Sequence, residues 1–388
     1  MGFLSGRISY LRFRVERPAP KLFGQEQLDA LNERAIGFQR TASKDGGDAG
    51  WIAGDDILDT EFELAKNIVN DALIFALRID TLKLPPDLLR AYLRIELKAL
   101  AAGNPSGLPS FRQKREAREA ARERLELEAK DGRYTRRKAY PILWDRLSNT
   151  LLVASTAGSV LDKLHGLFQD TFNTSLTLCD AGQFAAQEFP STALDKLQPS
   201  AFQPGAAVGE VAWVGDPGSG NYLGNEFLLW LWYVLDNEED TLKLPDQSEA
   251  TVMFSRTLTL ECPKAVSGSE SIRCEVPNRL PEARRAIQSG KLPRKAGLTI
   301  LRHDLQYELT LQAENLGISG AKLPASEESD DRARLDERID QLRQLIDVMD
   351  QLYRGFLRRR LGSDWPKELE QIKRWLQKDD RARRQAAG

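Results

Sequence analysis

The sequence predicts an α+β fold with antiparallel or mixed sheets and long helices. Three observations favour it. Runs of β-branched and aromatic residues of strand length occur in both halves of the chain. Apolar residues at helical spacing separate several of these runs. In addition, 41% of the 388 residues are apolar, which suffices for a buried core in a chain of this length.

The first 140 residues are predicted to contain strands at 7–15 and 72–79 and helices at 26–38, 85–100 and 111–130. Pro85 and Pro86 stand in the first turn of the second helix, where proline is tolerated. The helix at 111–130 is rich in Ala, Glu and Arg and poor in apolar residues, so we expect it to be exposed on most sides. Two prolines and a glycine within 104–109 should break the chain between these two helices.

The rest of the chain is predicted to contain strands at 150–155, 175–179, 298–301 and 305–311 and helices at 157–168, 335–356 and 368–376. The strongest periodic signal is a heptad seam formed by Leu335, Ile339, Leu342, Ile346, Met349, Tyr353 and Phe356. Such a seam is typical of a helix that packs along one face. It fits a core helix of its own domain or a helix pair across a dimer interface.

These breaks divide the chain into five parts. They are an N-terminal α+β part (1–103), a charged helical finger (104–140), a strand–helix–strand part (141–200), a Trp-rich insertion with a C-terminal β part (201–325), and the heptad helix with a basic tail (326–388).

Several classes of protein are excluded. The longest apolar run, 227–235, has nine residues, whereas a membrane span needs about 20. No basic segment followed by an apolar stretch marks a signal peptide at the start. Three distant cysteines and two histidines form neither a disulfide framework nor a metal motif. We therefore expect a cytoplasmic protein without a metal site or a membrane partner.

Catalytic motifs are weak. The glycine-rich segment 215–220 lacks the Gly-Lys-Ser/Thr that a phosphate-binding loop requires, so a surface turn is favoured. Three acidic clusters are candidate Mg²⁺ ligands of a nuclease: Asp55 with Asp56 and Asp59, Glu238 with Glu239 and Asp240, and Asp330 with Asp331. Acidic residues in polar loops and at helix starts more often cap and solubilise the chain. We expect no enzyme activity, no catalytic residues and no cofactor.

The net charge of −2 conceals a segregation of charge along the chain. Four segments are basic: 1–21 (net +4), 112–138 (+5), 278–302 (+6) and 354–388 (+6). Two segments, 234–249 and 326–350, carry net −5 each. A partner responds to the local field, because salt screens charges beyond about 10 Å. Around 136–138, cations alternate with Tyr134 and Tyr140, as is common on nucleic-acid-binding surfaces.

The order of these segments resembles the bacterial recombination-associated protein RdgC family over most of residues 1–362. The segments that carry the resemblance are Gly50-Trp51-Ile52, the strand 73–79 before the Pro85 helix, Ile142-Leu143-Trp144-Asp145, the stretch 149–161, Ala286-Ile287-Gln288-Ser289-Gly290-Lys291, the strand at 307–311 and the stretch 318–324.

The resemblance implies a crescent-shaped protomer, two of which close into a ring-shaped dimer around duplex DNA. It further implies DNA binding with little sequence preference, restraint of recombinase-driven strand exchange, and no cofactor. This chain departs from the family in its Trp-rich block, in its tail after Gly362 and in Ile300, where the family has Trp. Because residues 275–277 read Glu-Val-Pro, no DNA contact is carried over to them.

The sequence thus predicts a non-enzymatic, nucleoid-associated, double-stranded DNA-binding homodimer, with a recombinase or another DNA-processing protein as a further partner. The expected phosphate contacts are Arg112, Lys114, Arg115, Arg118, Arg136, Arg137, Lys138, Arg284, Arg285, Lys291, Arg294 and Lys295. The alternatives are a protein-interaction adaptor that uses the heptad helix and an exposed Trp-rich block, a metal-dependent nuclease, and a DNA-binding factor of phage defence or plasmid maintenance.

Overall fold

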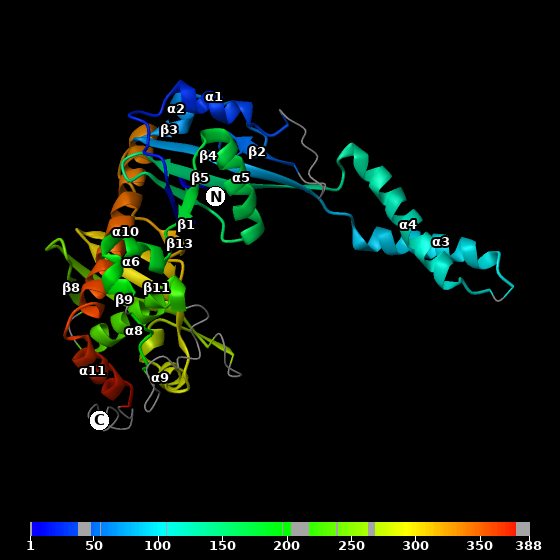
Figure 1. The fold of residues 1–388 in the computed structure, drawn as a ribbon. Helices are drawn as coiled ribbons and strands as arrows, with labels where there is room; N and C mark the ends of the chain where they lie inside the picture. Colours follow the sequence, from blue (N-terminus) through cyan, green and yellow to red (C-terminus); the bar gives the residue numbers. More distant parts are fainter. Residues whose placement is uncertain are drawn as a thin grey trace.

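The computed structural model describes residues 2–37, 48–54, 56–105, 107–195, 197–202, 217–237, 240–262 and 268–377. Within these residues the fold is α+β, as predicted, with eleven α-helices and a large sheet whose named strand pairs are all antiparallel (Figure 1). None of the described helices is long and apolar enough to cross a membrane.

The strands are β1 (Ile8–Val15), β2 (Asp48–Ile52), β3 (Ile68–Val69), β4 (Ala72–Leu82), β5 (Thr135–Asp145), β6 (Thr150–Val153), β7 (Leu176–Leu178), β8 (Thr241–Lys243), β9 (Glu249–Glu261), β10 (Ser269–Cys274), β11 (Leu292–Arg302), β12 (Leu305–Gln312) and β13 (Ile318–Lys322). The helices are α1 (Gln25–Glu33), α2 (Leu64–Asn67), α3 (Pro86–Ala102), α4 (Phe111–Glu128), α5 (Gly158–Phe172), α6 (Ala181–Glu188), α7 (Ser191–Leu194), α8 (Tyr222–Asn237), α9 (Pro281–Gln288), α10 (Asp331–Arg360) and α11 (Trp365–Gln377).

Strand β1 joins the two halves of the sheet, whose order is β10-β9-β11-β12-β13-β1-β6-β5-β4-β2. Its beginning pairs with β13, where Ile8 lies opposite Ala321. Its end pairs with β6 and β7, so that Phe13 lies opposite both Leu151 and Leu178. The N-terminal strand therefore connects a strand from the C-terminal part of the chain, β13, with two strands from its middle, β6 and β7.

Two hydrophobic cores lie on the sheet. The first contains the inward side chains of β9, β11 and β12 together with helices α6, α8, α9, α10 and α11, and it extends across β1 to β4, β5 and β6. The second lies on the other side of β1, β4, β5 and β6, beneath α1 and α5. The strands of the N-terminal half are consequently covered on both sides, which explains the nearly continuous apolar run of β4.

Helices α3 and α4 form an arm, residues 83–134, that projects from the end of the β4–β5 hairpin (Figure 1). The two helices pack through a narrow stripe on α4, in which Ala117, Ala121 and Leu125 are buried, whereas no residue of α3 is fully buried. Most of the arm is thus exposed, as the charge pattern of 111–130 predicts. The expected boundary at 103/104 falls between these two packed helices.

The heptad seam lies within α10. Five of its seven residues are buried in the first core of the same chain, and Leu335 and Ile346 are half-buried against it. This arrangement corresponds to the core-helix interpretation, so the seam is not available for a helix pair across a dimer interface.

Two local expectations were wrong. The helix expected over 26–38 ends at Glu33, because Ala35 pairs with Trp51 and the Ile36 amide donates to the Trp51 carbonyl at 3.0 Å. The Trp-rich block is not exposed where it is described, since Trp230 and Trp232 of α8 are buried in the first core. Residues 203–216 of that block, with Trp213, lie outside the described residues.

Close packing of α8 against the sheet yields a stability prediction. A Cβ at Gly224 would lie 1.9 Å from the Ala313 carbonyl oxygen, so Gly224→Ala should destabilise the fold by about 1–3 kcal/mol. Gly166→Ala in α5 is the matched control: its Cβ would meet nothing within 4 Å, and it should stabilise the helix by about 0.5–1 kcal/mol. Urea unfolding measures both, and equal midpoints for the two variants would contradict the packing described here.

Candidate nucleic-acid interface

The C-terminal half of the sheet has a polar side opposite the first core. Side chains of a strand alternate between the two sides of a sheet. In β9, β11, β12 and β13, the inward set is apolar, and the outward set is half-buried and rich in hydroxyl groups. We call the hydroxyl members of this outward set the hydroxyl face; they are Thr251, Ser255, Thr257, Thr259, Thr299, Thr310 and Ser319. The same side also carries Met253 and Leu301, which are exposed, and the Glu308 carboxylate.

Three cations surround one carboxylate on the hydroxyl face. Glu308 is 16% exposed, and its carboxylate lies 2.8 Å from the Arg256 guanidinium. Arg7 and Lys322 each approach the same carboxylate to 3.7 Å. All three cations are largely exposed, so the cluster presents a net positive charge to solvent.

A β-bulge places Arg256 in this cluster. The pairing of β9 with β11 shifts register beside Leu298, and Arg256 takes a positive φ of 65°. The bulge presses β9 against its neighbour, because a Cβ at Gly297 would lie 2.0 Å from the Ser255 carbonyl oxygen. The glycine therefore permits the close approach that turns the arginine outward.

The hydroxyl face continues into the side of the sheet that α1 and α5 cover. In β1, Tyr10 belongs to the first core and the next residue, Leu11, to the second. Likewise in β5, Leu143 belongs to the first core, and Ile142 and Trp144 belong to the second. The second core thus lies on the same side of the continuous sheet as the hydroxyl face.

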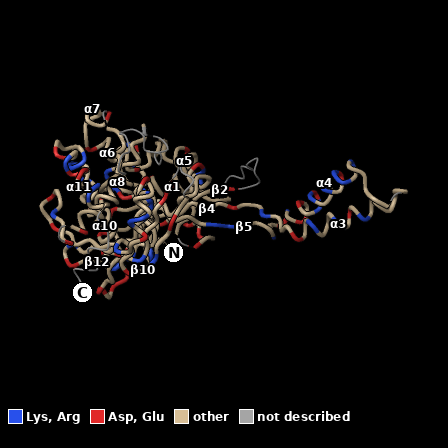
Figure 2. Tube along the Cα trace, turned by 90° about the horizontal axis from the view of Figure 1, so that it is seen from below, with Lys and Arg blue, Asp and Glu red and all other residues tan. Residues whose placement is uncertain are grey.

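Strand alternation divides the basic run of β5 between the two sides of the sheet. Figure 2 marks this run at the root of the arm. Arg136 and Lys138 lie on the same side as Tyr140, and the Lys138 ammonium is 5.1 Å from the centre of the Tyr140 ring. Arg137 lies on the opposite side, 3.6 Å from the Asp80 carboxylate. Between described residues, neither Arg136 nor Lys138 forms an ion pair, so both are available to an anionic partner.

The cations of α4 are largely exposed, but several are paired along the helix. Arg112 donates to Glu116 at 2.9 Å and Arg115 to Glu119 at 3.0 Å. Lys114 and Arg118 form no ion pair with a described residue. Helical ion pairs of this kind are weak, so a phosphate can compete for these arginines.

The group at 284–295 separates into buried and exposed members. The Arg284 guanidinium is buried, pairs with Asp236 and lies 5.2 Å from the centre of the Trp375 ring. Lys291 is also buried and pairs with Glu270.

Three expected contacts of that group remain nearer the surface. Arg294 pairs with Glu314 at 2.9 Å, and Arg285 and Lys295 are exposed. Lys295 alternates with the core residue Ala296, which places it on the same side of the sheet as the hydroxyl face. We therefore include Lys295 in the interface and leave out Arg284 and Lys291.

Sequence reasoning missed Arg7, Arg256 and Lys322. Arg7 directly precedes β1, and the other two lie in β9 and β13, far along the chain. Only the alternation of threonine and serine with apolar residues in β9 pointed to a polar side of the sheet.

The acidic clusters have structural partners where they are described. The Asp59 carboxylate pairs with Lys66 at 2.9 Å. Asp330 caps α10 by accepting from the Ala333 amide, and Asp331 pairs with Arg334. Asp55, Glu238 and Glu239 lie outside the described residues. Within the described part of the chain, no group of three or more His, Cys, Asp or Glu side chains is arranged to hold a metal ion.

Burial holds two titratable side chains in their protonated forms. Burial raises the pKa of the Cys179 thiol, and it raises the pKa of Tyr307 to about 12. Both side chains therefore stay protonated. The described end of the glycine-rich segment packs on α6: Asn221 accepts from the Gly182 amide at 3.0 Å, and a Cβ at Gly182 would lie 1.8 Å from the Ser219 carbonyl oxygen.

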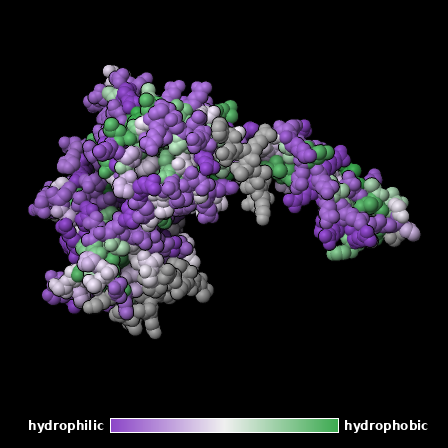
Figure 3. Space-filling model, turned by 45° about the horizontal axis from the view of Figure 1, so that its top comes forward, coloured by the Kyte–Doolittle hydropathy of each residue, from purple (hydrophilic) through white to green (hydrophobic). Residues whose placement is uncertain are grey.

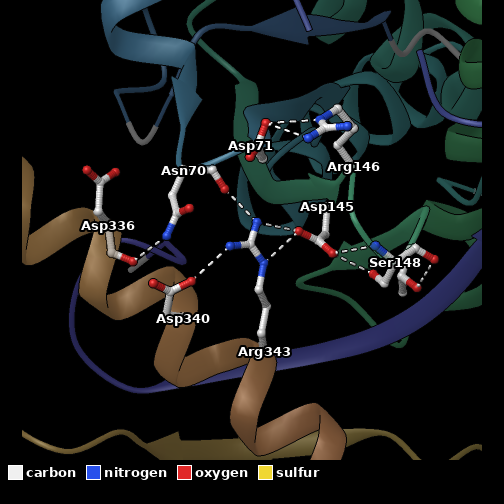
Figure 4. A network of polar contacts seen from close by, with 9 residues as sticks. Asn70, Asp71, Asp145, Arg146, Ser148, Asp336, Asp340 and Arg343 are labelled. Carbon is white, nitrogen blue, oxygen red and sulfur yellow. Dashed lines mark hydrogen bonds and ion pairs between the residues drawn. The ribbon is translucent and has the colours of Figure 1, made fainter. Parts of the chain in front are cut away.

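Polar contacts fix α10 beneath the β4–β5 hairpin (Figure 4). The buried Asp145 carboxylate accepts from Arg343 at 2.6 and 2.9 Å, and from the Ser148 amide and hydroxyl at 2.9 and 2.6 Å. Arg343 also donates to the Asn70 carbonyl. These contacts hold the strands that bear the arm against the helix of the first core.

No protein-family model matches the chain, and no curated protein sequence matches it. The argument for an interface therefore rests on the positions of the charged and hydroxyl side chains.

Removal of Arg343 tests the contact between α10 and the sheet. Arg343→Ala leaves the buried Asp145 carboxylate without its charged partner, which should destabilise the fold by about 3 kcal/mol. Arg334→Ala in the same helix removes an exposed pair with Asp331 and should cost less than about 1 kcal/mol. Thermal and urea unfolding compare the two variants; a larger loss for Arg334→Ala would show that the Asp145 pair does not anchor α10.

Proposed function

We propose that this chain binds double-stranded DNA without sequence preference, through phosphate contacts on one side of its sheet. The observation that carries the proposal is that exposed cations from distant segments share that side. Arg136 and Lys138 lie at the root of the arm, and Arg256, Lys322 and Lys295 lie on the C-terminal half. Lysine and arginine neutralise phosphates and release counterions whatever the base sequence.

The hydroxyl face supports the same proposal. Hydroxyl groups donate hydrogen bonds to phosphate oxygens and carry no charge that would repel them. The long strands β9 and β11 present these groups in rows along one side of the sheet. Such a surface suits a regular, repeating ligand better than a small molecule.

The assembly and cellular role follow from the resemblance to the RdgC family. We propose a crescent-shaped protomer that closes with a second copy into a ring around the duplex. In that arrangement the protein restrains recombinase access in the cytoplasmic nucleoid and performs no catalysis. Burial of the heptad seam and of Trp230 and Trp232 counts against the adaptor alternative.

Charge-reversal variants test which side of the sheet contacts DNA. Arg136→Glu with Lys138→Glu should weaken DNA binding and flatten the log–log salt dependence by about two units. The control, Arg358→Glu with Lys367→Glu, makes the same change in net charge at exposed positions of α10 and α11, the helices of the first core. Titrations of each variant with DNA at several salt concentrations measure both the affinity and its salt dependence. An equal loss in both variants would mean that net charge, rather than this side of the sheet, governs binding.

Assembly is tested without DNA. Light scattering across micromolar concentrations should give the mass of a dimer, since closed two-fold pairing is the commonest symmetry of homo-oligomers. A monomeric mass throughout that range would contradict the ring, while leaving the charge-reversal experiment unaffected.

A further inference from the structure

The end of the arm differs from its shaft in both charge and hydropathy. We call residues 97–115 the arm tip; this segment contains Lys98, Arg112, Lys114 and Arg115 and no acidic residue. From Glu116 onward, acidic side chains alternate with basic ones along α4. The arm tip therefore carries four cations and no carboxylate of its own, although Arg112 and Arg115 pair with Glu116 and Glu119 just beyond it.

Two large apolar side chains project from this positive tip. Phe111 is 89% exposed and Leu108 is 71% exposed. Figure 3 shows hydrophobic side chains gathered at the end of the arm. Neither contributes to the packing of α3 on α4, which uses the stripe of Ala117, Ala121 and Leu125. Apolar groups kept in water at the end of a long projection indicate a surface that meets a partner.

A polar network fixes the backbone that carries these two side chains. Asn104 donates to the Leu108 carbonyl at 2.7 Å and to Gln113 at 2.7 Å. Gln113 in turn accepts from the Ser110 amide at 2.8 Å and closes a capping box at the start of α4. Phe111 is thereby fixed as the first residue of the helix, and Leu108 is fixed in the turn before it.

We propose that Phe111 and Leu108 form a wedge that inserts between base pairs of the bound duplex and bends it. The wedge rests on the proposed DNA binding. Apolar side chains at the end of a protein arm insert between base steps in several DNA-bending proteins, with flanking cations on the phosphates. Here Arg112, Lys114 and Arg115 supply the cations next to the apolar pair.

The shaft of the arm distinguishes DNA from an anionic membrane as the partner. A helix that lies on a membrane presents a continuous apolar face and a basic polar face. The shaft of α4 instead carries Glu116, Glu119, Glu123 and Glu126, and its apolar stripe is covered by α3. Among the described residues of the arm, Phe111 and Leu108 are the exposed apolar groups that lie in a segment with cations and no carboxylate.

The test measures bending and affinity with a short duplex labelled at both ends with a fluorescence donor and acceptor. The parent should increase energy transfer on binding, and it should bind a duplex with a central mismatch more tightly than an intact one, because a mismatch lowers the cost of unstacking. Phe111→Ala should lower affinity about tenfold, abolish the bend and remove the preference for the mismatch. Its salt dependence should match that of the parent, since Phe111 carries no charge.

Leu127→Ala is the matched control. Leu127 is 64% exposed on the same helix but lies at the opposite end from the tip. Its replacement should leave bending and affinity unchanged. Equal losses in the two variants would show that exposed apolar area in general, rather than the wedge, supports binding.

Further outcomes distinguish a failure of the wedge proposal from a failure of the proposed DNA binding. If the parent fails to bind any duplex, the DNA-binding proposal fails. If it binds with a steep salt dependence but without bending, the wedge alone is wrong. Loss of the dimer in Phe111→Ala without DNA would assign the tip to contacts between copies of this chain. Binding to vesicles of anionic lipid that disappears in Phe111→Ala would assign it to a membrane; either result overturns the wedge.

Discussion

The architecture depends on the double pairing of strand β1. Its two edges bring together β13 from the C-terminal part of the chain and β6 and β7 from its middle. The eight residues Ile8–Val15 thereby join the two halves of the sheet. Helix α10 reinforces the junction: Arg12 of β1 pairs at 2.7 Å with Asp350, and Arg343 pairs with Asp145 of β5. Removing one partner of a buried ion pair costs far more free energy of folding than formation of the pair contributes. These contacts therefore specify where the helix docks.

Continuity of the sheet decides which surfaces are available to a partner. Long helices cover one side throughout, whereas the other side is covered by α1 and α5 only over the N-terminal half. The remaining hydroxyl face and the root of the arm share that second side. Consequently, Arg136 and Arg256 can act on one ligand although 120 sequence positions separate them.

Local patterns predicted β1, β4, α3, α4, α5 and the heptad helix, because strand runs, helix starts and the heptad seam are set by neighbouring residues. They did not predict the long strands β5 and β9 or the helix α8. The residues of the candidate interface were harder to predict from local sequence patterns. Burial of Arg284 and Lys291 depends on Asp236 and Glu270, which come from other segments. The cluster around Glu308 depends on strand register. Only the separation of Arg137 from its neighbours followed from local sequence, since strand alternation applies once 135–145 is recognised as a strand.

Net charge is a poor guide to this molecule because much of its acidity is used internally. Glu226 is buried against Arg360, and Arg302 is held between Asp246 and Asp347. Such pairs contribute little to the external field, as each carboxylate lies within contact of a guanidinium. A charge of −2 therefore sums a neutralised interior and an uneven exterior. For a chain of this kind, binding to an anion is better judged from which cations lack a partner than from the total.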